Sequence, residues 1–331
     1  MVATIMTPGL VSIIVASYNH AGYLERRMES LLGQTYQNIE VLVIDDCSTD
    51  NSLDVLRKYE SCSGVQLVAR NENGGWVVVF NQGTEMSAGE FILFANCDDE
   101  CDPTMVERLV EGMRANPSAG ICYCRSLLID EEGHPLGDDF SGRERTFRAR
   151  CATDVLLDKN EMQRFLLDSC VIPNTSAALI RRACFNSVGR ISSEYRICSD
   201  WLLYFDIVRH YDVAYIAAPL NKFRQHKSSI TGGAKSRIMY EEILRLLLGQ
   251  IKTLGLSSTE KARYRMHVMY LWAIHLLSPT TGGMLNFNFH LKIALAYDWV
   301  ALTFLPIAMV GRFVSLLYKF PVRSLKKIVA G

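Results

Sequence analysis

The first 125 residues alternate short apolar runs with segments whose apolar positions repeat at helical spacing. The apolar runs predict strands covered on both faces, because neither side of them is polar; they span residues 10–16, 39–44, 65–69, 91–95 and 120–124. The segments between them predict helices over residues 21–34, 50–59, 76–87 and 103–115. This alternation predicts an α/β fold with a mostly parallel mixed sheet, flanked by helices and joined by right-handed crossovers.

The pattern becomes less regular after residue 125 and then turns helical. Residues 130–150 are polar and rich in glycine and charge, which predicts a mobile connection. The elements expected next are a strand at 176–180, a helix at 200–210 and a strand near 213–217. Beyond Gly232 and Gly233, the pattern predicts a helical C-terminal extension, with helices at 235–254, 258–277 and 288 to about 318.

The end of the chain is apolar and then basic. Residues 293–310 are strongly apolar but are interrupted by Asp298 and Pro306, so they only marginally meet the length of about twenty apolar residues that a spanning helix needs. Basic and aromatic residues accompany this stretch: Arg312, Lys319, Arg323, Lys326, Lys327, Trp299, Phe313, Tyr318 and Phe320. Such an end suits a helix lying in the face of an anionic membrane. The alternatives are a helix packed on the protein's own core, a dimer contact and, third, a true span.

Composition narrows the class of protein. The 331 residues are 49% hydrophobic and carry no formal net charge, which suits one large or two modest domains and argues against nucleic-acid binding, since that needs a basic face. Residues 1–9 lack the basic start and apolar stretch of a signal peptide. We therefore expect the ten cysteines to be reduced thiols in a cytosolic protein; none has the paired spacing of a zinc site.

Polar residues follow the predicted strands where a parallel sheet presents its carboxyl ends. Asp98 and Asp99 come directly after the fourth strand, and neighbouring acids of this kind indicate a hard divalent cation, which usually also holds a phosphate. Tyr18 follows the first strand and could stack on a base, while a carboxylate at residues 45–46 could accept hydrogen bonds from a base or ribose. Residues 71–75 follow the third strand, with glycines that allow close backbone approach. Together these positions predict a nucleotide site.

The ordered set of these motifs resembles the family 2 glycosyltransferases. The resemblance lies in Val11-Ser12-Ile13-Ile14-Val15-Ala16-Ser17-Tyr18-Asn19, Gln34-Thr35-Tyr36, Glu40 to Asp50, Asn73-Gly74-Gly75, Asn81-Gln82-Gly83 and Gly89-Glu90-Phe91-Ile92 leading to Asp98-Asp99. It covers roughly residues 10–230 and implies a GT-A-type nucleotide-diphospho-sugar transferase fold. The chain departs from the family at Cys47, where glycine is frequent, and at Phe80, where an arginine often supplies a positive contact to phosphate.

The resemblance implies a set of binding residues. It places Ala16, Tyr18 and Asp46 at the base and ribose, with Asn19 and Asn73 beside them. It places Asp98 at the ribose and diphosphate, and Asp99 at a Mg²⁺ or Mn²⁺ ion bound to that diphosphate.

Two later motifs complete the implied site. Asp200 resembles the family's catalytic base, which takes a proton from the acceptor hydroxyl; the alternative is a helix N-cap, and Glu194 is the nearest substitute for the base. Residues 223–229 resemble the loop that closes over the donor, in which His226 would bind metal or phosphate and Arg224 would neutralise the leaving group. Residues 166–182, with Asn174, are expected to face the acceptor.

These expectations define an inverting, metal-assisted glycosyltransferase that uses a UDP-sugar and a glycan or lipid-linked glycan acceptor in polysaccharide biosynthesis. Residues 1–232 would form the catalytic domain, with a nucleotide-binding half at 10–125 and an acceptor half at 126–232, followed by the helical region 233–331. The expected location is the cytoplasmic face of the cell membrane. The alternatives are a non-catalytic nucleotide-binding protein of the same fold and a nucleotidyltransferase. A dinucleotide-dependent oxidoreductase is disfavoured because no G-x-G-x-x-G follows the first strand.

Overall fold

A computed structural model describes residues 6–226, 236–277 and 287–319, the side chains of 236–237 and 313–319 excepted. The chain divides into two compact units, Met1–Tyr195 with Ser199–Ser229, and Arg196–Cys198 with Ile230–Gly331. The predicted closing loop beyond His226, the helix start at Lys235 and the basic end from Phe320 lie outside the described residues.

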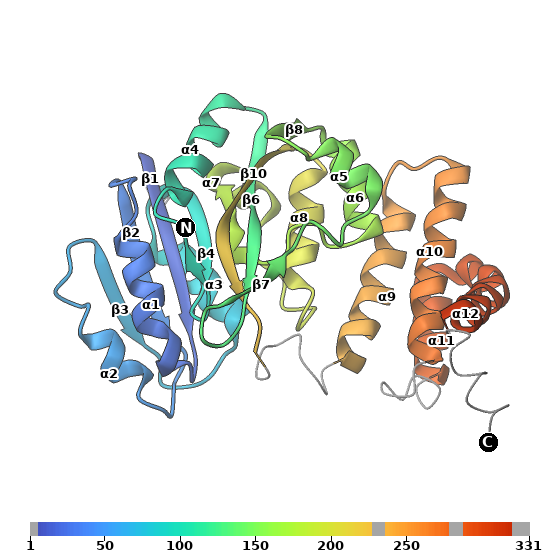
Figure 1. Cartoon of the computed structure of the whole chain (residues 1–331), viewed down its shortest axis with the longest axis horizontal. Coiled ribbons are helices and arrows are strands. Elements are labelled where there is room, and N and C mark those ends of the chain that lie inside the picture. The colour runs from blue at the N-terminus through green and yellow to red at the C-terminus, as the bar shows by residue number, and fades with distance from the viewer. Residues whose placement is uncertain (1–5, 227–235, 278–286, 320–331) are drawn as a thin grey trace, which may run out of the picture. The chain divides into compact units, whose positions relative to one another are not determined.

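The first unit is built on a ten-stranded sheet in the order β3-β2-β1-β4-β9-β6-β10-β5, with β7 paired to β6 and β8 paired to β10 (Figure 1). Its strands are β1 (Thr7–Ser17), β2 (Ile39–Asp45), β3 (Val65–Ala69), β4 (Gly89–Asn96), β5 (Glu100–Cys101), β6 (Ala119–Ile129), β7 (Pro135–Asp138), β8 (Val155–Leu157), β9 (Ala178–Arg181) and β10 (Asp212–Arg224). The first four strands in this order are parallel, and β9 then runs antiparallel between β4 and β6. The predicted strands are confirmed, except that the one expected at 176–180 begins only at Ala178, and the sheet is mixed.

The helices of the first unit are α1 (Ala21–Leu32), α2 (Ser52–Arg57), α3 (Trp76–Met86), α4 (Met105–Ala115), α5 (Arg145–Arg150), α6 (Lys159–Asp168), α7 (Arg182–Val188) and α8 (Ser199–Val208), with a 3₁₀ turn η1 at Thr175–Ala177. Alternate residues of the central strands face opposite layers. Ile13 belongs to the core cluster that includes side chains of α1 and α4, whereas Phe94 packs against Phe80 of α3 and Phe185 of α7. Helices therefore cover both faces, which explains why the strands are apolar throughout.

Two local predictions in the first unit were wrong. Helix α4 begins at Met105 and not at Pro103, because Asp102 turns the chain by accepting hydrogen bonds from the backbone N–H and the hydroxyl of Thr104. Residues 130–150, expected to be an irregular connection, contain β7 and α5. Strand β7 extends the sheet through its antiparallel pairing with β6, a long-range contact that local composition does not reveal.

The second unit is helical, as expected. Its helices are α9 (Ser236–Thr253), α10 (Ser258–Leu276), α11 (Phe287–Asp298) and α12 (Leu305–Lys319), with a 3₁₀ segment η4 at Trp299–Phe304. The single helix predicted from 288 to about 318 is therefore wrong, because η4 divides it in two. Helix α10 begins with a capping box, in which Ser257 and Glu260 satisfy each other's backbone N–H. Asp298, which interrupts the apolar stretch in the sequence, is held by Arg265 of α10 at 2.6 and 3.1 Å.

Candidate active site

The site of the sequence prediction lies at the carboxyl ends of β1, β2 and β4. In the strand register, Ala16 is paired with both Ile44 and Asn96, so the three following loops start side by side. Asn19 joins two of these loops, because its side-chain oxygen accepts a 2.7 Å hydrogen bond from the backbone N–H of Thr49. Tyr18 remains 42% exposed at this rim, which leaves its ring available for stacking.

Asp46 is already engaged by the protein. Its carboxylate accepts hydrogen bonds from the backbone N–H groups of Gly74 and Gly75 and lies 2.8 Å from the guanidinium of Arg70. Gly75 has a φ of 82°, a left-handed conformation that a larger residue adopts only with strain. Asn73 donates to the backbone carbonyl of Asp46. In this arrangement Asp46 and Asn73 hold the β2 and β3 loops together, and a base or ribose would have to share the Asp46 oxygens.

Asp98 and His226 form the charged centre of the rim. The Nε2 atom of His226 lies 2.8 Å from Oδ2 of Asp98. Burial opposes ionisation of Asp98, but the hydrogen bond from His226 and the nearby imidazoles of His20 and His226 outweigh it, so the pKa of Asp98 is lowered. The same hydrogen bond raises the pKa of His226. His20, which sequence reasoning overlooked, packs its ring against that of His226 at a centroid distance of 5.4 Å.

Asp99 has a different environment from Asp98. It is 1% exposed, and its oxygens accept hydrogen bonds from the backbone N–H of Arg224 at 3.0 Å and the side chain of Asn174 at 2.9 Å. Burial, followed by the charge of Asp98, raises the pKa of Asp99 to about 7. The structure thus pairs His226 with Asp98, whereas the sequence had grouped His226 with Asp99 as metal ligands.

Asn174 belongs to a buried polar chain and does not line an open surface. It is 5% exposed, and its side-chain oxygen accepts a hydrogen bond from Asn221 of β10, which also donates to Ser126 of β6. Together with Asp99 these residues join the ends of β4, η1, β6 and β10. The expectation that residues 166–182 face an acceptor stays a prediction, although the side chain of Asn174 itself is buried in this polar chain.

Arg224 is likewise committed to the protein. It is 1% exposed, and its guanidinium donates to the backbone carbonyls of Asp98, Asp130 and Glu131 and to the carboxylate of Glu100. The ring of Tyr23 lies 5.0 Å from the guanidinium carbon. Because every guanidinium nitrogen has a protein acceptor and the side chain is buried, Arg224 is placed to order these loops; the predicted contact with a leaving group stays a prediction.

Asp200 lies in the first turn of α8, half buried, and its carboxylate accepts a 2.7 Å hydrogen bond from the backbone N–H of Trp201. The preceding residue Ser199 fixes the start of the helix by donating to the carbonyls of Ser192 and Tyr195. The acid therefore sits at the N-terminus of α8. Because α8 begins at Ser199, Asp200 lies inside the helix and not at the N-cap, so the N-cap alternative is wrong.

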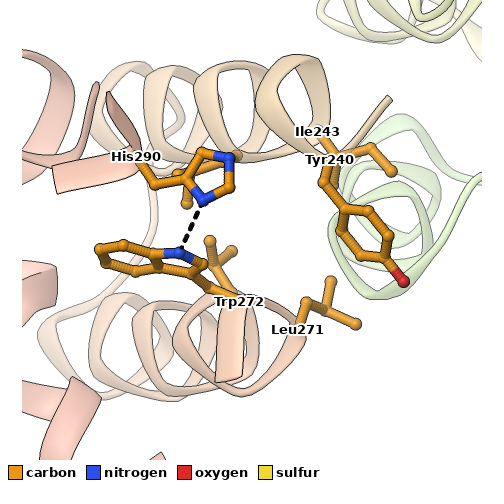
Figure 2. A pocket seen from close by; sticks show the side chains of 7 residues that line it. Tyr240, Ile243, Leu271, Trp272 and His290 are labelled. Atoms are coloured by element: carbon orange, nitrogen blue, oxygen red, sulfur yellow. Dashed lines mark hydrogen bonds between the residues drawn. The ribbon is translucent and has the colours of Figure 1, made fainter. Parts of the chain in front are cut away.

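The second unit contains a small apolar cavity among α9, α10 and α11 (Figure 2). Its lining includes Tyr240, Leu271, Trp272 and His290, and the indole N–H of Trp272 donates to Nδ1 of His290 at 2.9 Å. The cavity volume is about 10 Å³, room for roughly one water molecule. It is too small for a sugar nucleotide.

The chain belongs to glycosyl transferase family 2, which matches residues 12–189. A Bacillus subtilis (strain 168) glycosyltransferase, TuaG, named provisionally for teichuronic acid biosynthesis, is 33% identical over 128 residues, which are 38% of this chain and 50% of TuaG. The aligned part thus spans about half the length of that relative.

Solved structures show the fold to be of the GT-A type. TarS 1–349 of S. aureus in complex with UDP matches with a TM-score of 0.58 and 20% identity over 83% of this chain and 74% of that one. The mannosyltransferase PcManGT of Pyrobaculum calidifontis, in complex with GDP-Man and Mn²⁺, matches with a TM-score of 0.55 and 15% identity over 94% of this chain and 87% of that one.

Proposed function

We propose that the protein is an inverting glycosyltransferase that moves a sugar from a nucleoside diphosphate to a hydroxyl of a glycan or lipid-linked glycan. The observation that carries this proposal is the Asp98–His226 pair at the carboxyl end of β4, beside the exposed Tyr18, in a chain of family 2. Ligands of open α/β sheets bind at such strand ends. The GT-A-type relatives in complex with UDP and with GDP-Man support a nucleotide-sugar donor, and we favour a UDP-sugar.

In our proposal, Asp98 and His226 hold a divalent ion. A carboxylate oxygen and an imidazole nitrogen that lie 2.8 Å apart can turn toward one ion together, whereas the Asp99 oxygens already accept two protein hydrogen bonds. When bound, the ion supplies positive charge that neutralises the departing diphosphate. We therefore assign the metal role to Asp98 in place of Asp99, which supports the loops beneath it.

In the proposed reaction, Asp200 accepts the proton of the acceptor hydroxyl while the hydroxyl oxygen attacks the anomeric carbon. The carbon–oxygen bond to the diphosphate breaks in the same displacement, so the configuration inverts and no covalent enzyme intermediate forms. Tyr18 stacks on the base of the donor, and the loops ordered by Asn19, Asp46 and Arg224 shape its pocket.

We further propose that the enzyme works at the cytoplasmic face of a membrane, where lipid-linked acceptors lie. Residues Phe287–Arg312 form a segment that is long and apolar enough to cross a membrane, and only 22% of its most apolar window is buried. The break at η4 and the ion pair at Asp298 favour a segment lying on the surface over one that spans the bilayer.

The test is nucleotide release with a panel of nucleotide sugars and Mn²⁺, using the wild-type chain, Asp200→Asn and, as a control on the same helix, Asp206→Asn. We expect one donor to turn over, Asp200→Asn to lose roughly a hundredfold or more in kcat, and the control to stay active. Full activity of Asp200→Asn would remove it from the base role. Nucleotide binding without turnover of any donor would favour a non-catalytic protein of the same fold.

A further inference from the structure

His20 lies beside the Asp98–His226 pair, although it comes from a different part of the chain. It follows β1 and directly precedes α1, whereas Asp98 follows β4 and His226 follows β10. The potential ligand atoms of His20, Asp98 and His226 all lie within 4.8 Å of one another. The two imidazole rings meet edge to face, with an interplanar angle of 74°. Three separate loops thus bring two imidazoles and one carboxylate to a single point.

The hydrogen bonding of His20 prepares one ring nitrogen to act as a ligand. Its Nδ1 lies 2.7 Å from the backbone carbonyl oxygen of Tyr18, and since a carbonyl only accepts, Nδ1 carries the proton. In the neutral ring Nε2 then holds a free lone pair. This Nε2 atom is buried and has no hydrogen-bond partner among the described residues. A histidine whose one nitrogen is fixed by a backbone carbonyl and whose other nitrogen is unpaired has the arrangement found in metal-ligating histidines.

We propose that His20, Asp98 and His226 form a two-histidine, one-carboxylate site for a transition-metal ion. Ligands about 2.1 Å from one ion and at right angles to each other lie about 3 Å apart, close to the 2.8 Å between His226 and Asp98. Three protein ligands leave positions open for oxygen atoms of a diphosphate. This last step rests on the proposed function, but the ion site itself does not.

The ligand set also selects the ion. Mg²⁺ prefers oxygen ligands and keeps several of its waters, whereas imidazole nitrogen binds the later transition metals more strongly, in the order Mn²⁺, Fe²⁺, Co²⁺ and Ni²⁺. A site with two imidazole ligands should therefore bind Co²⁺ and Mn²⁺ more tightly than Mg²⁺. Of the two ions that the sequence left open, Mg²⁺ and Mn²⁺, this ligand set favours Mn²⁺.

The test is a titration of the full chain with Co²⁺ alone, followed by visible absorption, with Mg²⁺ as competitor. In His20→Asn the side-chain amide can keep donating to the Tyr18 carbonyl, but no ligand replaces Nε2. His20→Gln places an amide group near the position of Nε2, and His210→Asn is an exposed control. We expect His20→Asn to lose roughly tenfold or more in Co²⁺ affinity, His20→Gln to lose less and to be more easily displaced by Mg²⁺, and His210→Asn to match the wild type.

Wild-type Co²⁺ affinity and spectrum in His20→Asn would overturn the inference, as would a wild-type chain that leaves the Co²⁺ spectrum unchanged. Thermal unfolding without metal checks that each variant is folded. Failure of the proposed function has a different signature: Co²⁺ binding that depends on His20, with no turnover of any nucleotide sugar.

Discussion

At the scale of single residues, two adjacent aspartates differ in what their carboxylates contact. Asp98 faces two imidazoles, while Asp99 is buried under a backbone N–H and an asparagine side chain. The sequence places them at the same rim, but it does not reveal which one points outward, because that depends on the paths of β10 and η1. The same limit applies to Arg224. Its charge suggested a phosphate contact in the sequence, whereas its hydrogen-bond partners in the structure include carbonyls of distant loops.

Alanine at each of the two positions separates their roles. Asp98→Ala should abolish the rise in melting temperature that Mn²⁺ gives the wild type, because a bound ligand stabilises the folded state by mass action. Asp99→Ala should keep that rise but lower stability in the absence of metal by about 2 kcal/mol, because two buried donors lose their acceptor. Thermal unfolding with and without Mn²⁺ measures both effects. The opposite result, in which Asp98→Ala keeps the rise caused by Mn²⁺ and Asp99→Ala loses it, would assign the metal role to Asp99.

The departure from the family at Cys47 has an explanation in the backbone conformation. Cys47 stands where the family often has glycine, and it adopts a φ of 65°. Glycine is favoured in that conformation because it has no Cβ to clash. The glycine that is frequent at this position in the family therefore reflects the backbone conformation of the loop after β2, and Cys47 adopts that conformation too.

At the scale of elements, the strands were predictable and the ends of helices less so. A strand covered on both faces must be apolar throughout, so β1, β2 and β4 stand out in the sequence. Helix ends depend on single hydrogen bonds, as at Asp102, and β7 depends on pairing with a partner strand. Another such contact appears at Glu242 of α9. Its carboxylate accepts hydrogen bonds from three successive backbone N–H groups, those of Arg196, Ile197 and Cys198.

Removing this carboxylate should loosen the segment that leads into α8 and Asp200. Glu242 is 8% exposed, so Glu242→Ala would leave three donors poorly hydrated, and we expect a stability loss of about 2 kcal/mol or more. Lys252→Ala, an exposed change on the same helix, is the control and should stay within about 0.5 kcal/mol of the wild type. Urea unfolding measures the difference. Equal midpoints for both variants would contradict the assigned contact.

At the scale of the whole molecule, the sequence predicted a family and a class of fold but not the complete strand order. Strand β9 enters the sheet antiparallel between β4 and β6, a placement set by the packing of residues far apart in the chain. The apolar C-terminal segment was predicted from composition, and its surface bears large exposed side chains: Phe289, Leu295, Trp299, Ile307 and Val310. Such a set fits the proposed contact with a lipid surface.

Charge placed on this segment should weaken membrane binding. Ile307 and Val310 are 62% and 65% exposed, so the double variant Ile307→Glu, Val310→Glu should fold normally but sediment less with anionic phospholipid vesicles. Leu136→Glu is the matched control, because Leu136 is 60% exposed on β7. Equal sedimentation of the double variant and the wild type would argue against membrane contact.

The bond between Asp99 and the backbone of Arg224 spans 125 positions of the chain. During synthesis, the first five strands can leave the ribosome long before β10 exists, and until then the acid at 99 lacks the arginine backbone N–H from which it accepts in the folded protein. Nascent chains that stop short of β10 would carry the acids at 98 and 99 without the arginine backbone at 224 and the histidine at 226. The proposed donor site should therefore be complete only once translation has passed the last strand of the sheet and the histidine at 226.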